Sequence, residues 1–75
     1  MTKINNENMQ TSKWLAIQIE LLVMIEEKLK EMKLLAERAV KEQENREEIA
    51  KIQAKMMTLT EEIALLEREQ QFVLH

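Results

Sequence analysis

The chain contains one stretch of eight residues without an apolar side chain, Lys41-Glu42-Gln43-Glu44-Asn45-Arg46-Glu47-Glu48. On both sides of it apolar residues recur at intervals of three and four, the spacing of one face of an α-helix. The stretch therefore separates two amphipathic segments. We predict a helical hairpin over 11–75, with a first helix over about 12–42, a turn at about 43–46 and a second helix over about 47–74.

Composition agrees with an all-α fold. The chain has 75 residues, no Gly, no Pro and no Cys, and 33% of its residues are charged. The two strongest helix breakers are absent, and a domain this short builds only a marginal core by itself. We therefore expect the hairpin to gain stability by self-association, as a homodimer that forms a four-helix bundle or as a higher homo-oligomer.

Residues 1–10 are polar and include three asparagines. We expect a flexible N-terminal arm there. Thr11 or Ser12 then supplies an N-cap for the first helix.

Two apolar seams with coiled-coil-like spacing flank the polar stretch. Continuing the heptads of the first seam would place an a position at residue 50, whereas the second seam has its a position at Ile49. A chain reversal removes this mismatch. One continuous long helix remains an alternative, because Lys, Glu and Gln favour helix and Asn45 is the only substitute for a C-capping Gly. The predicted core seam comprises Leu15, Leu22, Ile25, Leu29, Met32, Ile49, Ile52, Met56, Leu59, Ile63, Leu66 and Val73.

Folding the chain back about residue 44 pairs these seams in layers such as Leu22 with Leu66. The same alignment brings Gln18 beside Gln70. A buried amide needs a hydrogen-bond partner, so the pairing of the two glutamines supports the reversal.

The first helix has more apolar surface than a two-helix hairpin uses. A helix that is apolar on several sides is usually covered on several sides. We prefer self-association as the explanation, with binding of another protein as the alternative. The candidate oligomer or partner surface comprises Trp14, Ile17, Leu21, Val23, Met24, Leu35 and Met57.

The sequence offers no catalytic chemistry, so we expect no enzyme, no cofactor and no metal. The one histidine, His75, is the last residue, and the seams contain no carboxylate. The net charge of −3 and the interleaved Glu and Lys argue against a basic nucleic-acid-binding stripe. The most apolar stretch, residues 14–25, is too short to cross a bilayer, and we expect a cytoplasmic protein.

Our leading functional hypothesis is a small regulator or adaptor that binds a protein partner through apolar helix surface, such as an inhibitor of a transcription factor or enzyme. Richness in Lys, Asn, Ile and Glu suggests AT-rich coding, as in a phage or mobile element. A structural scaffold or oligomerisation element is the alternative, and a nucleic-acid-binding helical protein is the third.

Overall fold

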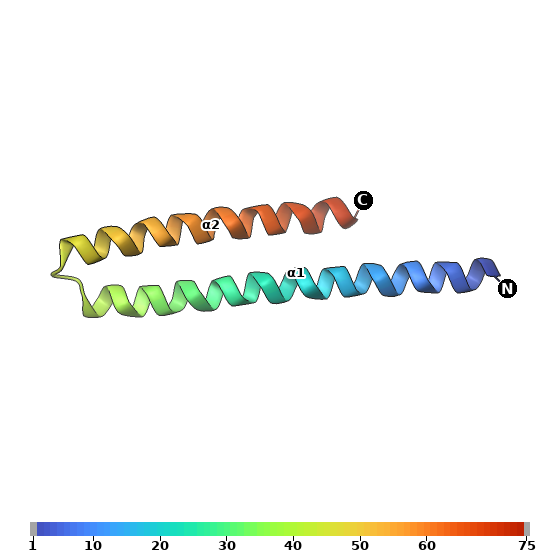
Figure 1. The fold of residues 1–75 in the computed structure, drawn as a ribbon, viewed down its shortest axis with the longest axis horizontal. Coiled ribbons are helices and arrows are strands. Elements are labelled where there is room, and N and C mark those ends of the chain that lie inside the picture. Colours follow the sequence, from blue (N-terminus) through green and yellow to red (C-terminus); the bar gives the residue numbers. More distant parts are fainter. Residues whose placement is uncertain (1, 75) are drawn as a thin grey trace.

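The chain folds into two antiparallel helices that lie side by side (Figure 1). The computed structural model describes the backbone of residues 2–74 and the side chains of residues 10–71. Helix α1 spans Thr2–Lys41 and helix α2 spans Arg46–Leu74. The molecule measures 66 × 17 × 10 Å. The predicted all-α hairpin is confirmed, whereas α1 begins at Thr2 and not near residue 12.

The reversal is made by Asn45. Its N–H donates to the Glu42 carbonyl (2.8 Å), which closes a tight turn, and its Oδ1 accepts from the Glu48 N–H (3.2 Å). Asn45 is therefore the N-cap of α2. No residue in the described chain has a positive φ, so Asn45, the only substitute for a C-capping Gly, does not form a left-handed cap at the end of α1.

Charges at the turn support both helix ends. Arg38 and Lys41 lie in the last turn of α1, and Glu47 and Glu48 lie in the first turn of α2. Each sign is the one that the helix dipole favours at that end. Arg38 Nη2 also lies 2.8 Å from Glu48 Oε1, which ties the two ends together.

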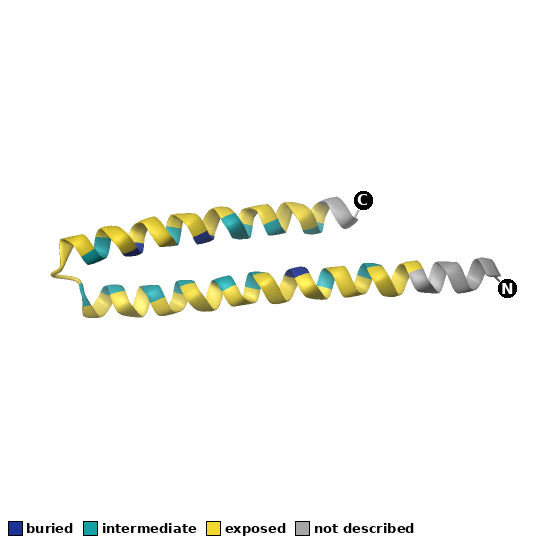
Figure 2. Ribbon diagram, in the orientation of Figure 1, coloured by how far each residue is buried: buried dark blue, intermediate teal, exposed yellow. Residues whose placement is uncertain are grey.

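The core is a single line of side chains along the inner edges of the helices (Figure 2). Leu21, Ile52 and Leu59 are its buried members, at 8%, 4% and 7% exposure. Other predicted seam residues are half-buried, namely Ile25, Met32, Ile49, Met56, Ile63 and Leu66. The side chain of Val73 lies outside the described residues.

Part of the predicted seam on α1 is wrong for this hairpin. Leu15, Leu22 and Leu29 are 47%, 54% and 53% exposed. The residue before each of them lies on the inner edge instead: Trp14 and Lys28 are half-buried and Leu21 is buried.

Lys28 explains why this edge of α1 can face α2. Its Nζ lies 3.2 Å from Glu62 Oε2 across the hairpin. The stem of a lysine can cover apolar surface while its ammonium reaches a carboxylate at the rim. A lysine among the inner residues is therefore compatible with the apolar line.

Gln18 faces the inner line without the predicted partner. Its Nε2 is buried and makes no hydrogen bond. The predicted amide pairing with Gln70 is therefore not formed through this nitrogen. The one-residue rotation of α1 relative to the predicted seam changes which residues lie opposite each other.

Candidate interaction surface

The hairpin has two broad faces, one on each side of the inner line. In α1, Ile17, Met24 and Glu31 each directly precede an inner residue and lie on one side. Leu22 and Leu29 each directly follow an inner residue and lie on the other side. This follows from the helical turn of about 100° per residue. The same rule applies to α2, and antiparallel packing places matching sides of the two helices together.

We call the first side the charged face. Ten of its fifteen positions are charged. Its positions are Ile17, Glu20, Met24, Glu27, Glu31, Leu34, Arg38 and Lys41 in α1, and Glu48, Lys51, Lys55, Thr58, Glu62, Leu65 and Glu69 in α2.

We call the opposite side the apolar face. Three of its fifteen positions are charged, and all fifteen are exposed. Its positions are Leu15, Ile19, Leu22, Glu26, Leu29, Lys33, Ala36 and Val40 in α1, and Ala50, Gln53, Met57, Thr60, Ala64, Glu67 and Gln71 in α2.

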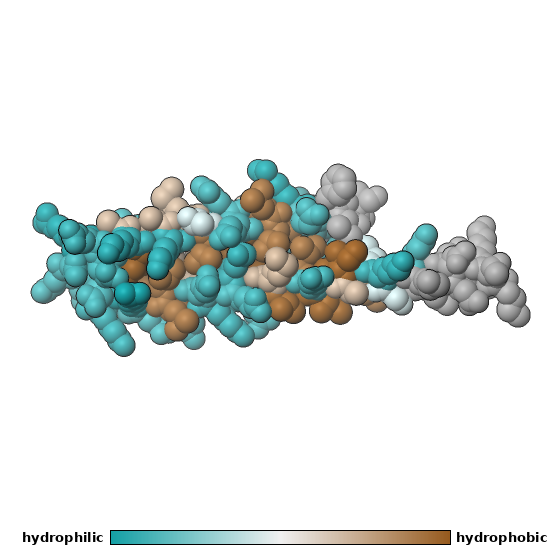
Figure 3. Space-filling view, in the orientation of Figure 1, coloured by the Kyte–Doolittle hydropathy of each residue, from teal (hydrophilic) through white to brown (hydrophobic). Residues whose placement is uncertain are grey.

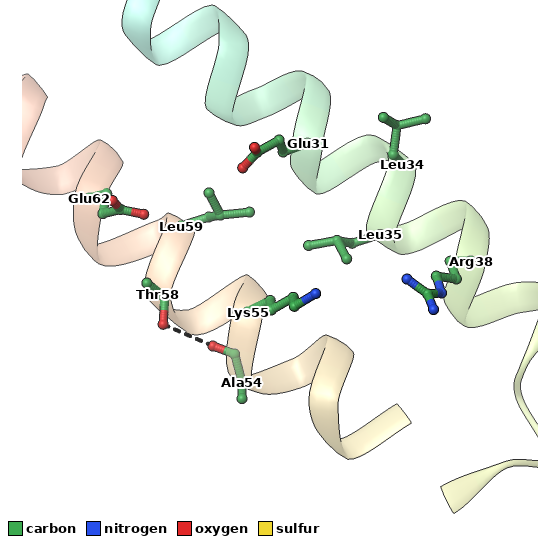
Figure 4. Close-up of a pocket in the computed structure, with 9 residues that line it drawn as sticks. All are labelled: Glu31, Leu34, Leu35, Arg38, Ala54, Lys55, Thr58, Leu59 and Glu62. Carbon is green, nitrogen blue, oxygen red and sulfur yellow. Dashed lines mark hydrogen bonds between the residues drawn. The ribbon is translucent and has the colours of Figure 1, made fainter. Parts of the chain in front are cut away.

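The charged face carries two open grooves between the helices. The larger has a volume of about 570 Å³ and lies toward the turn (Figure 4). In it Leu35 and Leu59 point toward each other, whereas Leu34 points away from α2. Glu31 and Glu62 stand at one end, and Arg38 and Lys55 at the other. The Thr58 hydroxyl donates to the Ala54 carbonyl one turn earlier (3.1 Å), and α2 is unbroken there.

The second groove, of about 340 Å³, lies farther from the turn. Met24 and Leu65 line it together with the half-buried Leu66. Glu62 and Glu69 also line it. It is therefore an apolar depression bordered by carboxylates, with the Lys28 ammonium already paired to Glu62.

Exposed apolar side chains are concentrated in the half of the hairpin away from the turn. Figure 3 shows one side of the molecule, where hydrophobic side chains gather along the line between the helices and spread in that half, while the turn end is hydrophilic. In α1 the large exposed apolar residues of this half are Leu15, Ile17, Ile19, Leu22, Val23, Met24 and Leu29.

The predicted candidate surface residues do not form one surface. Ile17 and Met24 lie on the charged face, Met57 lies on the apolar face, and Val23 lies on the outer side of α1 away from α2. Leu21 is buried and Leu35 half-buried on the inner edge, so the prediction that these two face outward is wrong.

Trp14 is half-buried in the described hairpin. Leu34 and Leu65, which are 64% and 60% exposed, are not among the predicted surface residues. Each directly precedes an inner residue, Leu35 and Leu66, so the correct inner line would have identified them.

Among the described residues, no group of three or more His, Cys, Asp or Glu side chains is arranged to hold a metal ion. Neither helix, over its described length, contains a window apolar enough to cross a membrane. The surface features that distinguish this hairpin are its grooves and its two unlike faces.

Comparisons with protein-family models, with curated proteins and with solved structures find no match to this chain.

Proposed function

We propose that the chain is a non-enzymatic regulator or adaptor that binds a protein partner through the charged face. The observation that carries this proposal is the set of exposed apolar side chains among carboxylates. Ile17, Met24 and Leu65 are 45%, 40% and 60% exposed. Contiguous apolar surface rimmed by polar residues is typical of a protein-binding site.

The chemistry of this surface defines the partner. Glu20, Glu27 and Glu69 lie beside these apolar side chains in the half of the charged face away from the turn, whereas its cations, Arg38, Lys41, Lys51 and Lys55, lie toward the turn. Complementary charges give an interface its specificity and its rate of association. The partner therefore offers apolar side chains, as one face of a helix does, with Lys or Arg beside them. Binding of this kind can inhibit a transcription factor or an enzyme by covering a basic surface.

The experiment begins with crosslinking mass spectrometry on the native complex, which identifies the partner. The purified partner is then titrated calorimetrically against the wild-type chain and two adjacent variants. Met24→Lys places a cation in the acid-bordered groove, and we expect it to weaken binding by about tenfold or more, as for an interface anchor. Val23→Lys makes the same kind of change on the outer side of α1 and leaves the affinity unchanged.

Salt provides a second readout. Raising the ionic strength screens exposed charges, so we expect weaker binding at high salt. Affinity that responds equally to Met24→Lys and Val23→Lys, or to neither, would show that the charged face is not the binding surface.

Self-association is the second candidate function, as a scaffold or oligomerisation element. Of the described side chains, only Leu21, Ile52 and Leu59 are buried, whereas eleven large hydrophobic side chains are exposed. This excess of exposed hydrophobic side chains favours a homodimer that packs as a coiled-coil-like four-helix bundle. Light scattering distinguishes the two functions. A scaffold gives large or open-ended assemblies as concentration rises, whereas an adaptor dimer gives one discrete small species.

A further inference from the structure

The two faces of the hairpin differ most in the free energy needed to remove their charged side chains from water. Covering the charged face removes ten charged side chains from water, and covering the apolar face removes three, Glu26, Lys33 and Glu67. Desolvation of each charge costs free energy unless a partner charge compensates it. The apolar face is therefore the side of the hairpin that can be buried at the lower cost.

The remaining polar groups of the apolar face are few. The Thr60 hydroxyl already donates to the Met56 carbonyl (2.8 Å), so covering it does not leave that donor unpaired. Gln53 and Gln71 are exposed and belong to α2. On α1 the face is built mainly from aliphatic side chains, among them Leu15, Leu22 and Leu29.

These aliphatic side chains follow a second helical seam. The positions of the apolar face on α1 are 15, 19, 22, 26, 29, 33, 36 and 40, with spacings that alternate between four and three. This is the spacing that packs one helix along another. Helix α1 therefore carries one seam for α2 and a second seam that α2 leaves uncovered.

We infer that the apolar face is the interface with a second copy of this chain. Residues 14–41 are the part of α1 that lies alongside α2, and this part is about 40 Å long at 1.5 Å per residue. With a width of 17 Å, the face has a footprint of about 700 Å² per chain. Two such faces supply about 1,400 Å², within the range of about 1,200–2,000 Å² for a stable specific interface.

A second copy also fits the shape of the face. It presents two ridges side by side, one from each antiparallel helix, and packing two copies through it gives a closed four-helix arrangement with an isologous interface. The inference rests on the self-association named above and assigns it to one side of the hairpin. It leaves the charged face of both copies open for the partner.

The test compares two leucines that are similarly exposed on opposite faces, Leu22 and Leu65, at 54% and 60%. Sedimentation equilibrium is measured for the wild type, Leu22→Glu and Leu65→Glu. We expect the wild type and Leu65→Glu to be dimers and Leu22→Glu to be a monomer.

A second readout does not depend on the stability of the monomer. The chain has no Cys, so Leu22→Cys and Leu65→Cys each introduce a unique thiol. For a dimer with a Kd of about 1 μM, mass action leaves about 7% of the chains monomeric at 100 μM. We expect alkylation of Leu22→Cys to slow about tenfold at 100 μM relative to high dilution, and alkylation of Leu65→Cys to be independent of concentration.

Each outcome would overturn a different part of the inference. A wild-type chain that stays monomeric at 100 μM overturns self-association itself. A dimer that survives Leu22→Glu, or that protects the thiol at position 65 and not at position 22, overturns the assignment of the face. Neither result changes the expected effect of Met24→Lys on the protein partner.

Discussion

Ile52 is the most deeply buried of the core side chains, at 4% exposure. Replacing it with alanine removes three carbons from the line between the helices. At about 0.8 kcal/mol per buried methylene, the loss of transfer free energy is about 2.4 kcal/mol. The hairpin is open on both sides and can relax around the gap, so the total stays near the lower end of the 2–5 kcal/mol range for such truncations. A domain of this size loses about 4–8 °C per kcal/mol, and we expect the melting temperature to fall by about 10–20 °C.

The control is Leu65→Ala, which also removes three carbons from α2 but at a side chain that is 60% exposed. Thermal unfolding followed by circular dichroism at 222 nm, at one protein concentration, compares the two variants with the wild type. We expect Leu65→Ala to change the free energy of unfolding by about 0.5 kcal/mol or less. Equal losses in the two variants would refute the inner line, because position 52 would then be no more buried than position 65.

Three further changes test single features of the hairpin, each by urea denaturation. Asn45→Ala removes the N-cap of α2, and we expect a loss of about 1 kcal/mol with an unchanged m-value; a wild-type midpoint would show that Asn45 does not cap the helix. Gln18→Met replaces the unpaired buried amide by an apolar side chain of similar length, and we expect a gain of about 1 kcal/mol; a loss would indicate that Gln18 has a hydrogen-bond partner in solution. Glu62→Gln removes the pairing with Lys28, and we expect a loss of about 0.2–1 kcal/mol that shrinks at 1 M salt; a loss that is unaffected by salt would mean that packing, not charge, is responsible.

The position of the reversal could be predicted from the sequence, because residues 41–48 contain no side chain that an inner line could use. The cap that makes the reversal was also visible. Asn45 followed by Glu47 and Glu48 is an N-terminal signature of α2. The sequence-based prediction treated Asn45 only as a substitute for a C-capping Gly of α1. The start of α1 at Thr2 had no such signal, since polar residues without Gly or Pro are compatible with helix or with a free arm.

The inner face of α1 could not be determined from periodicity. Two stripes share Gln18, Ile25, Met32 and Ala39 and differ by one position elsewhere. One adds the four apolar residues Leu15, Leu22, Leu29 and Ala36, and the other adds Trp14, Leu21, Lys28 and Leu35. Counting apolar residues favours the first stripe. In the structure the second stripe faces α2, and the Lys28 ammonium is accommodated there by its contact with Glu62, which depends on the tertiary arrangement.

Which of the two stripes of α1 faces α2 also determines which residues form the candidate interaction surface. With Leu21 inside, Leu22 and its neighbours become an outer face, and Met24 falls among carboxylates on the other side. The surplus of apolar surface was predictable from composition along α1. Its division into an apolar face and a charged face required the orientation of α1 relative to α2.

The measurement that tests the hairpin most directly is a distance between Glu20 and Glu69 within one molecule. Both side chains are exposed on the charged face, so spin labels attached through cysteines at these positions leave the inner line intact. Pulsed electron resonance on labelled chain diluted into unlabelled chain reports only the intramolecular distance. Antiparallel helices packed at 8–10 Å predict a distance on the order of 10–25 Å. A continuous helix would place the two sites about 74 Å apart at 1.5 Å per residue, and that result would contradict the hairpin and both faces defined from it.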